Sequence, residues 1–286
     1  MNSTLKLWTQ LGLGTALAGG LLAACGGEAG GEGAASGEAG AATSAATAGE
    51  GEGGSGPGEG EAAASGGEGE GGVAVADAAK DPVAYGIALA VAEAHVIAAR
   101  DAYAAGKKEA AGEMFAHPVS EVLLEMDPAF TTLGVKDMKP LFTTASDTAL
   151  AGKPVAEVNK AYDAIIAALR AAAAKAPQGG ASAAKVQAGV IADMIERASA
   201  MYRQLPRNAE YEPYLDGYGF ARVAASTFAA SGAGIKAENP ALHAAITKAL
   251  ALLGKAYPGA ARPAKLPAEP GALSGASAKV MLAAGG

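Results

Sequence analysis

Residues 81–106 read DPVAYGIALAVAEAHVIAARDAYAAG, and this stretch indicates the fold class. Asp81 followed by Pro82 is typical of a helix start, because an Asp side chain can cap free backbone N–H groups and Pro is tolerated in the first turn. Apolar or inward-facing residues then recur at helical spacing until Gly106, at Ala84, Ala88, Val91, His95, Ala98 and Ala102. The pattern predicts a long helix whose apolar stripe includes His95.

Proline and glycine divide the following sequence into further helical segments. The pattern predicts helices over 107–115, 119–126, 136–150, 155–176, 182–203, 215–231 and 239–256. His117 precedes Pro118, so we expect an extended backbone there, and Asp127-Pro128 is expected to end the helix that follows. No segment shows strict alternation of apolar and polar residues, so a sheet is not expected. The predicted fold is all-α, an antiparallel bundle of about six helices.

Composition narrows the classes of protein and of site. The chain has 286 residues, half of them hydrophobic, with one Cys, three His and a formal net charge of −7. A single Cys excludes an internal disulfide framework and zinc sites of the four-Cys or Cys₂His₂ kind. The acidic balance argues against a nucleic-acid partner, since such proteins normally present a basic face.

The N-terminus predicts export. Residues 1–24 combine Lys6 with a short apolar stretch, which fits a signal peptide better than a membrane span. Leu22-Ala23-Ala24-Cys25 resembles the lipobox of bacterial lipoproteins, which implies cleavage before Cys25 and lipidation of that cysteine, including palmitate-type acylation. Gly26 follows instead of Asp, so we expect the outer membrane, with the protein facing the periplasm. The alternative is an ordinary secretory signal with a chance cysteine.

Three further regions follow the signal. Residues 25–75, beginning with Cys25, are rich in Gly, Ala, Ser and Glu, and we expect a disordered tether because little can be buried. A cation-binding Glu run is the alternative to a solvated spacer. Residues 76–258 are the predicted bundle domain, and 259–286 are expected to be a loosely ordered tail with a short helix near 276–284.

His95, His117 and Glu121 form the first candidate site. Two imidazoles and a carboxylate suit zinc, iron or copper if the helices bring them together. Further carboxylates that could join them are Glu93, Glu125 and Asp127. The alternative is that His95 is a hydrogen-bonded core residue and that His117-Pro118 merely begins a helix.

The second candidate site lies in residues 211–222, YEPYLDGYGFAR. Its polar and aromatic side chains next to two glycines could form the wall of a ligand pocket, namely Tyr211, Tyr214, Asp216, Tyr218 and Arg222. Alternatively, the large rings of Tyr214, Tyr218 and Phe220 fill the core of an Ala-rich bundle. The third histidine, His243, is expected at the surface or rim.

Two stretches carry a family resemblance: AHVIAARDAYAAGKKEAAGEMFAHPVSEVLLEMDPAF (94–130) and EYEPYLDGYGFARVA (210–224). They resemble a group of uncharacterised helical bacterial envelope proteins and, more distantly, the imelysin-like periplasmic proteins linked to iron uptake. Imelysin-like proteins carry a GxHxxE metal motif, whereas His117 to Glu121 here is HPVSE, one residue longer and preceded by Ala116. The resemblance implies a helical periplasmic binding module.

Three functions remain open at this point. The first is a lipid-anchored periplasmic binding module for a divalent or iron-type metal ion or a small ligand. The second is a structural lipoprotein whose bundle docks onto an envelope protein partner, and the third is a metal-dependent hydrolase. No nucleophile elbow, phosphate loop, dinucleotide fingerprint or HExxH helix is found in the sequence, so an enzyme is the less favoured interpretation. Converging histidines would favour the binding module, and separated histidines with an exposed apolar patch would favour the docking protein.

Overall fold

The computed structural model describes residues 77–285, and within them the secondary structure is helical throughout, with no strand. The predicted all-α bundle is therefore confirmed. The predicted signal peptide, Cys25 and the tether lie outside the described residues. The elements are α2 (Pro82–Ala104), α3 (Lys108–Pro118), the π-helix η1 (Val119–Leu123), α4 (Leu124–Leu133), α5 (Lys139–Leu150), α6 (Val155–Ala173), α7 (Ala183–Gln204), α8 (Glu212–Glu238), α9 (Pro240–Ala256) and α10 (Pro270–Ala284).

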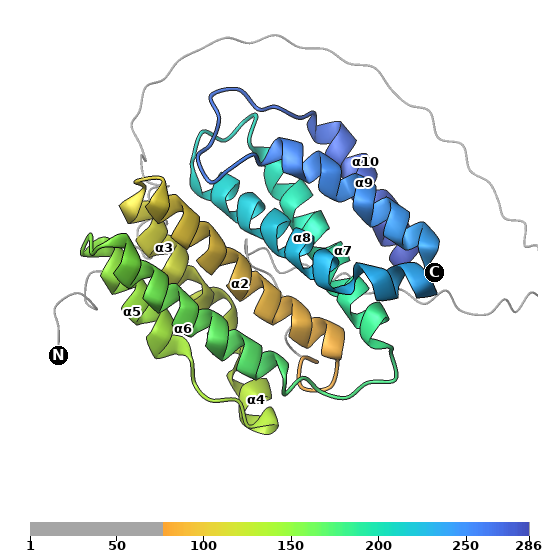
Figure 1. Ribbon diagram of the computed structural model, residues 1–286, viewed down its shortest axis with the longest axis horizontal. Helices are drawn as coiled ribbons and strands as arrows, with labels where there is room; N and C mark the ends of the chain where they lie inside the picture. Colours follow the sequence, from red (N-terminus) through yellow and green to blue (C-terminus); the bar gives the residue numbers. More distant parts are fainter. Residues whose placement is uncertain (1–76, 286) are drawn as a thin grey trace, which may run out of the picture. The chain divides into compact units, whose positions relative to one another are not determined.

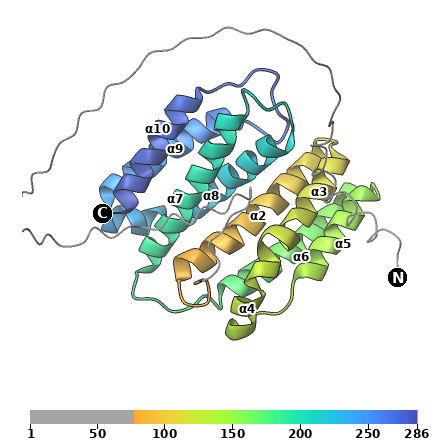
Figure 2. The same ribbon diagram turned by 180° about the vertical axis from the view of Figure 1, so that it is seen from behind.

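Helix α2 is the central element of this bundle. It packs against α3 and α6 on one side and against α7 and α8 on the other (Figure 1). The view from behind shows the same division, with α3 to α6 and α7 to α10 flanking α2 (Figure 2). Because both sides of α2 are covered, burial extends well beyond the single stripe that the sequence predicts. The helix is long and apolar enough to cross a membrane, but 72% of its most apolar window is buried inside the bundle.

The predicted caps explain where several helices begin. Asp81 accepts a hydrogen bond from the backbone N–H of Val83 at 2.7 Å, and Ser182 accepts one from that of Lys185 at 3.1 Å. Each cap satisfies an N–H group that has no partner within its own helix. Local sequence chemistry thus sets these helix starts, as predicted.

The chain around Pro118 differs from the prediction. His117 is helical, not extended, and α3 continues through Pro118 directly into η1 and α4. A proline lacks the N–H that an α-helix needs and crowds the preceding turn. Here the helix widens immediately after Pro118, and the N–H of Leu124 donates to the carbonyl of Val119, five residues earlier. Asp127-Pro128 likewise does not end a helix, because Pro128 sits inside the first turns of α4.

The predicted loosely ordered tail is also corrected. Helix α10 packs against α7 and α9 and is longer than the short helix expected there. Leu273 and Val280 are buried, and the hydroxyl of Ser277 bonds to the Glu196 carboxylate. The tail sequence is rich in Ala and Gly, so it lacks a clear amphipathic pattern of helical period. Its helix is stabilised by packing against the apolar surfaces of α7 and α9.

Candidate functional site

The three residues of the first candidate site converge in the middle of the bundle. His95 comes from α2, His117 from the last turn of α3 and Glu121 from η1, and their ligand atoms lie within 4.8 Å of one another. One oxygen of Glu121 faces each imidazole: Oε2 is 3.2 Å from His95 Nε2, and Oε1 is 3.7 Å from His117 Nδ1. A single carboxylate therefore bridges the two histidines.

Helix α8 brings two more carboxylates to the same place. Asp216 Oδ1 is 3.5 Å from His95 Nε2, and Glu212 Oε1 is 3.4 Å from His117 Nδ1. The two acids are four residues apart, so they share one face of α8. We call these five residues, His95, His117, Glu121, Glu212 and Asp216, the histidine–carboxylate cluster.

Two glycines of α8 lie at very close contacts with neighbouring parts of the bundle. A Cβ atom on Gly219 would lie 2.3 Å from the backbone oxygen of Ala94, the residue next to His95. One on Gly217 would lie 1.9 Å from the hydroxyl of Tyr257. The absence of a side chain at Gly219 lets the backbone of α8 contact α2 directly and places Asp216, about one turn earlier, against His95, whereas Gly217 makes room for the Tyr257 side chain.

Hydrogen bonding orients the His95 ring. Its Nδ1 is 2.8 Å from the carbonyl oxygen of Val91, so Nδ1 carries a proton and donates it. Nε2 is left facing Glu121 and Asp216. Phe220 closes the site from α8, with its ring centroid 5.9 Å from that of His95. A fixed tautomer of this kind is typical of metal-ligating histidines.

The cluster strongly favours positive charge. Burial by itself would lower the pKa of His95, but the hydrogen bond to Glu121 and the negative charges of Asp216 and Glu121 outweigh it and raise that pKa to about 9. Burial would raise the pKa of Glu121, but its hydrogen bond and charge interaction with His95 lower it instead. Without a bound cation, protonated His95 supplies the positive charge between the two carboxylates.

The cluster is buried on one side and accessible on the other. The side chains of His95 and Asp216 are 4% and 8% exposed, whereas those of His117, Glu121 and Glu212 are 23%, 29% and 47% exposed. A pocket of about 290 Å³ adjoins the accessible side, lined by Ala110, Glu113, Met114, His117, Glu210, Tyr211, Glu212 and Leu215. Burial, together with the charges of Glu109 and Glu212, raises the pKa of Glu113. We call this 290 Å³ pocket the acidic pocket.

The other carboxylates considered for the first site lie elsewhere. Glu93 is buried and forms two hydrogen bonds with Arg170 of α6, at 2.6 and 2.5 Å. Glu125 is exposed, and Asp127 pairs with Lys139. Sequence proximity to His95 or His117 therefore does not decide which acids join them.

The residues of the second candidate site do not form one pocket, and they have different roles in the structure. Tyr214 and Tyr218 are buried, and their hydroxyls donate to the Gly259 carbonyl and the Asp101 carboxylate, both at 2.7 Å. Their rings fill the core, as the packing alternative expects. The other residues divide as follows: Tyr211 lines the acidic pocket, Asp216 joins the cluster and Arg222 is exposed.

Glu212 was not singled out by the sequence. The signal that could have found it is its four-residue spacing to Asp216, which places both acids on one helix face. That spacing becomes informative only once α8 is known to pack against α2. His243, expected near the surface, is half-buried on α9 with its ring centroid 4.9 Å from that of Phe228.

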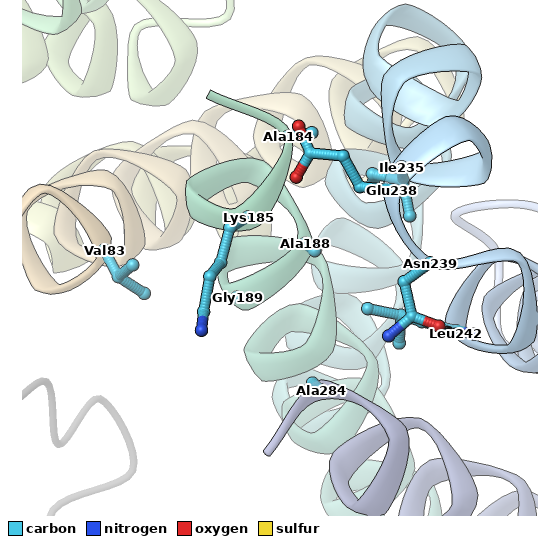
Figure 3. Close-up of a pocket in the computed structure, with 10 residues that line it drawn as sticks. All are labelled: Val83, Ala184, Lys185, Ala188, Gly189, Ile235, Glu238, Asn239, Leu242 and Ala284. Atoms are coloured by element: carbon cyan, nitrogen blue, oxygen red, sulfur yellow. Dashed lines mark hydrogen bonds between the residues drawn. The ribbon is translucent and has the colours of Figure 1, made fainter. Parts of the chain in front are cut away.

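Another pocket, of about 360 Å³, lies where α2 begins (Figure 3). Its lining comes largely from α7, α8 and α9 and includes Val83, Lys185, Glu238 and Asn239. Val83 precedes His95 by twelve residues (95 − 83), which is roughly 18 Å along a helix. This pocket is therefore separate from the histidine–carboxylate cluster.

No family model, curated protein or solved structure matches the chain. The resemblance to envelope and imelysin-like proteins stays a prediction. Two imidazole nitrogens and three carboxylates form a donor set of the kind that zinc, iron and copper accept in proteins. The fixed His95 tautomer and the half-open side fit such an ion.

Proposed function

We propose that the bundle is a metal-binding module that captures a transition-metal cation such as zinc, iron or copper. The observation that carries the proposal is the convergence of His95, His117 and Glu121 to within 4.8 Å, although they come from three helical elements. Imidazole and carboxylate ligands of one ion lie a few ångströms apart, since each sits about 2.0–2.2 Å from the metal. The spacing needs only small side-chain adjustments to reach that geometry.

The charge of the cluster supports the same proposal. Glu121, Asp216 and Glu212 place three carboxylates around two imidazoles. A divalent cation would replace the proton on His95 Nε2 and interact favourably with these carboxylates. The hydrogen bond from Nδ1 to Val91 is preserved, because it uses the other ring nitrogen.

The acidic pocket supports access for a cation from solvent. Glu113, Glu210 and Glu212 line it, and none of the described residues that line it is Lys or Arg. A pocket lined by one sign of charge raises the local concentration of the opposite ion. It adjoins His117 and Glu212, the more exposed members of the cluster. Capture would therefore proceed from the pocket to the buried His95.

We further infer that this module is held in the bacterial envelope. The lipobox-like segment ending at Cys25 and the Gly/Glu-rich region after it are features of the sequence. Acylation of Cys25 would anchor the chain, and stable anchoring would need more than one acyl chain, since a single chain binds a membrane only marginally. Such an anchor at the outer membrane, facing the periplasm, would suit capture of metal and its transfer to an envelope partner. Substitution Cys25→Ser tests this part, because it removes the acylation site, and incorporation of labelled palmitate into the protein is expected to be lost.

Metal analysis of the purified full-length protein tests the binding function. We expect a near-stoichiometric content of zinc, iron or copper that is lost in a His95→Gln/His117→Gln variant. His243→Gln is the matched control, because His243 lies on α9 and packs against Phe228 outside the cluster. A wild-type protein that is metal-free and shows no rise in melting temperature on addition of Zn²⁺, Fe²⁺ or Cu²⁺ would contradict the proposal.

A further inference from the structure

The segment that follows α9 holds the loop that leads into α8. Arg262 is the centre of this contact. Its guanidinium donates hydrogen bonds to three backbone carbonyls of the α7–α8 connection, those of Leu205 at 2.9 Å, Asn208 at 2.8 Å and Glu210 at 2.5 Å. One rigid fork of donors thus fixes three points of a loop that has no regular secondary structure of its own.

Two tyrosines tie the start of α8 to the same segment. The hydroxyl of Tyr211 donates to the carbonyl of Ala260 and that of Tyr214 to the carbonyl of Gly259, each at 2.7 Å. Their rings stack with centroids 6.4 Å apart. We call residues 257–268 the C-terminal clamp. It contacts the chain on both sides of Glu212.

Glu212 depends on such support more than the other members of the cluster. It is the first residue of α8, and its side chain is 47% exposed, whereas Asp216 is held by the close packing of α8 on α2. An exposed Glu at a helix end has many accessible side-chain conformations, and its backbone frays unless it is held. The Glu212 carboxylate nevertheless lies 3.4 Å from His117 Nδ1. The clamp fixes the backbone from which that carboxylate reaches the site.

We propose that the C-terminal clamp sets the metal affinity of the cluster, with Arg262 as a positioning residue that acts through Glu212. This inference rests on the proposed metal-binding function and adds its regulation. Coupling of this kind is reciprocal, so a bound metal ion also holds the clamp in place. A partner that displaced the clamp would weaken metal binding and favour transfer of the ion.

The test compares Zn²⁺ affinities of full-length variants by competition with a chromophoric chelator. Arg262→Ala is expected to weaken Zn²⁺ binding by about tenfold, the scale at which supporting residues act on metal sites. The same substitution in a Glu212→Gln background is expected to have little further effect, because the residue through which it acts is already neutralised. Arg203→Ala is the matched control, since the Arg203 guanidinium bonds to Glu196 and Ser274.

The inference is overturned if Arg262→Ala leaves the Zn²⁺ affinity unchanged, or if it weakens that affinity equally in the wild-type and Glu212→Gln backgrounds. If Arg262→Ala does not fold, Tyr211→Phe removes a single hydroxyl from the same contact, and a smaller loss of affinity that depends on Glu212 is expected. A wild-type protein that binds no metal would overturn the proposed function itself, which distinguishes that failure from failure of the clamp alone.

Discussion

The carboxylate of Asp216 lies 3.5 Å from Nε2 of His95, although the first residue belongs to α8 and the second to α2. Through this contact, Asp216 of the second candidate site joins the histidines of the first. The contact exists because Gly219 lets α8 pack against the backbone of α2 at Ala94. The cluster is thus a product of helix packing.

Neutralising Asp216 is expected to weaken metal binding. Asp216→Asn keeps the shape of the side chain but removes a charge that helps to raise the pKa of His95. We expect at least a tenfold loss of Zn²⁺ affinity, as is typical when a supporting carboxylate of a metal site is removed. In the metal-free protein, NMR titration should show a lower pKa for His95. Asp163→Asn, at an exposed position on α6, is the control and should leave both quantities unchanged.

The stability of the metal-free protein is expected to fall at alkaline pH. The folded-state pKa of His95 is about 9, above the ordinary value of 6.5, so folding favours the protonated ring. That contribution is fully present below pH 6.5 and is lost as the pH rises through about 9. The lowered pKa of Glu121 acts in the acidic range and leaves this window unaffected.

Urea unfolding in the presence of a chelator, from about pH 6 to about pH 10, measures this loss. The same series on His95→Gln isolates the contribution of the imidazole, since other groups that titrate in this range are common to both proteins. Identical pH profiles for the two proteins would show that His95 is not the source.

Adding a methyl group at Gly219 is expected to separate α8 from α2. The new Cβ of Gly219→Ala would lie 2.3 Å from a backbone oxygen, which cannot move independently of α2. We expect a loss of about 1–3 kcal/mol in unfolding free energy, the usual range for overpacking, together with weaker metal binding.

Gly254→Ala is the matched substitution within α9. A Cβ there meets nothing within 4 Å, so the better helix propensity of alanine should stabilise the protein by up to about 1 kcal/mol. Opposite signs for the two glycines, measured by thermal and urea unfolding, are the expected pattern. Equal effects would contradict the close-packing argument.

Neutralising the acidic pocket is expected to slow metal capture. A Glu113→Gln/Glu210→Gln variant removes two charges that line the pocket without altering the cluster itself. We expect a severalfold lower association rate for Zn²⁺ in stopped-flow measurements, with a weaker dependence on ionic strength and an almost unchanged dissociation rate. Glu157→Gln on α6, which is exposed and lies outside the pocket, should behave like wild type. A change confined to the dissociation rate would place these acids in the binding site instead.

Helix positions could be predicted because their causes are local. Asp81 and Ser182 cap their own helices, and apolar spacing reports burial over a few turns. The prediction was wrong at Pro118. A proline normally breaks a helix, but here the helix continues and widens into the π-helix η1. The prediction was also wrong for residues 270–284, whose helix is ordered by packing on α7 and α9 and not by a strong local signal.

The residues of the candidate site were likewise only partly predictable from the sequence. The sequence by itself determined the helical class, the capped helix starts at Asp81 and Ser182 and the scarcity of histidine, and it led to His95, His117 and Glu121. Only the tertiary structure decided which acids complete the cluster: Glu93 turns to Arg170, whereas Asp216 and Glu212 reach the histidines. The physical reason is range, because capping and periodicity act within a few residues along the chain. The neighbours of an imidazole depend on how closely distant helices pack, and here a glycine opposite Ala94 sets that distance.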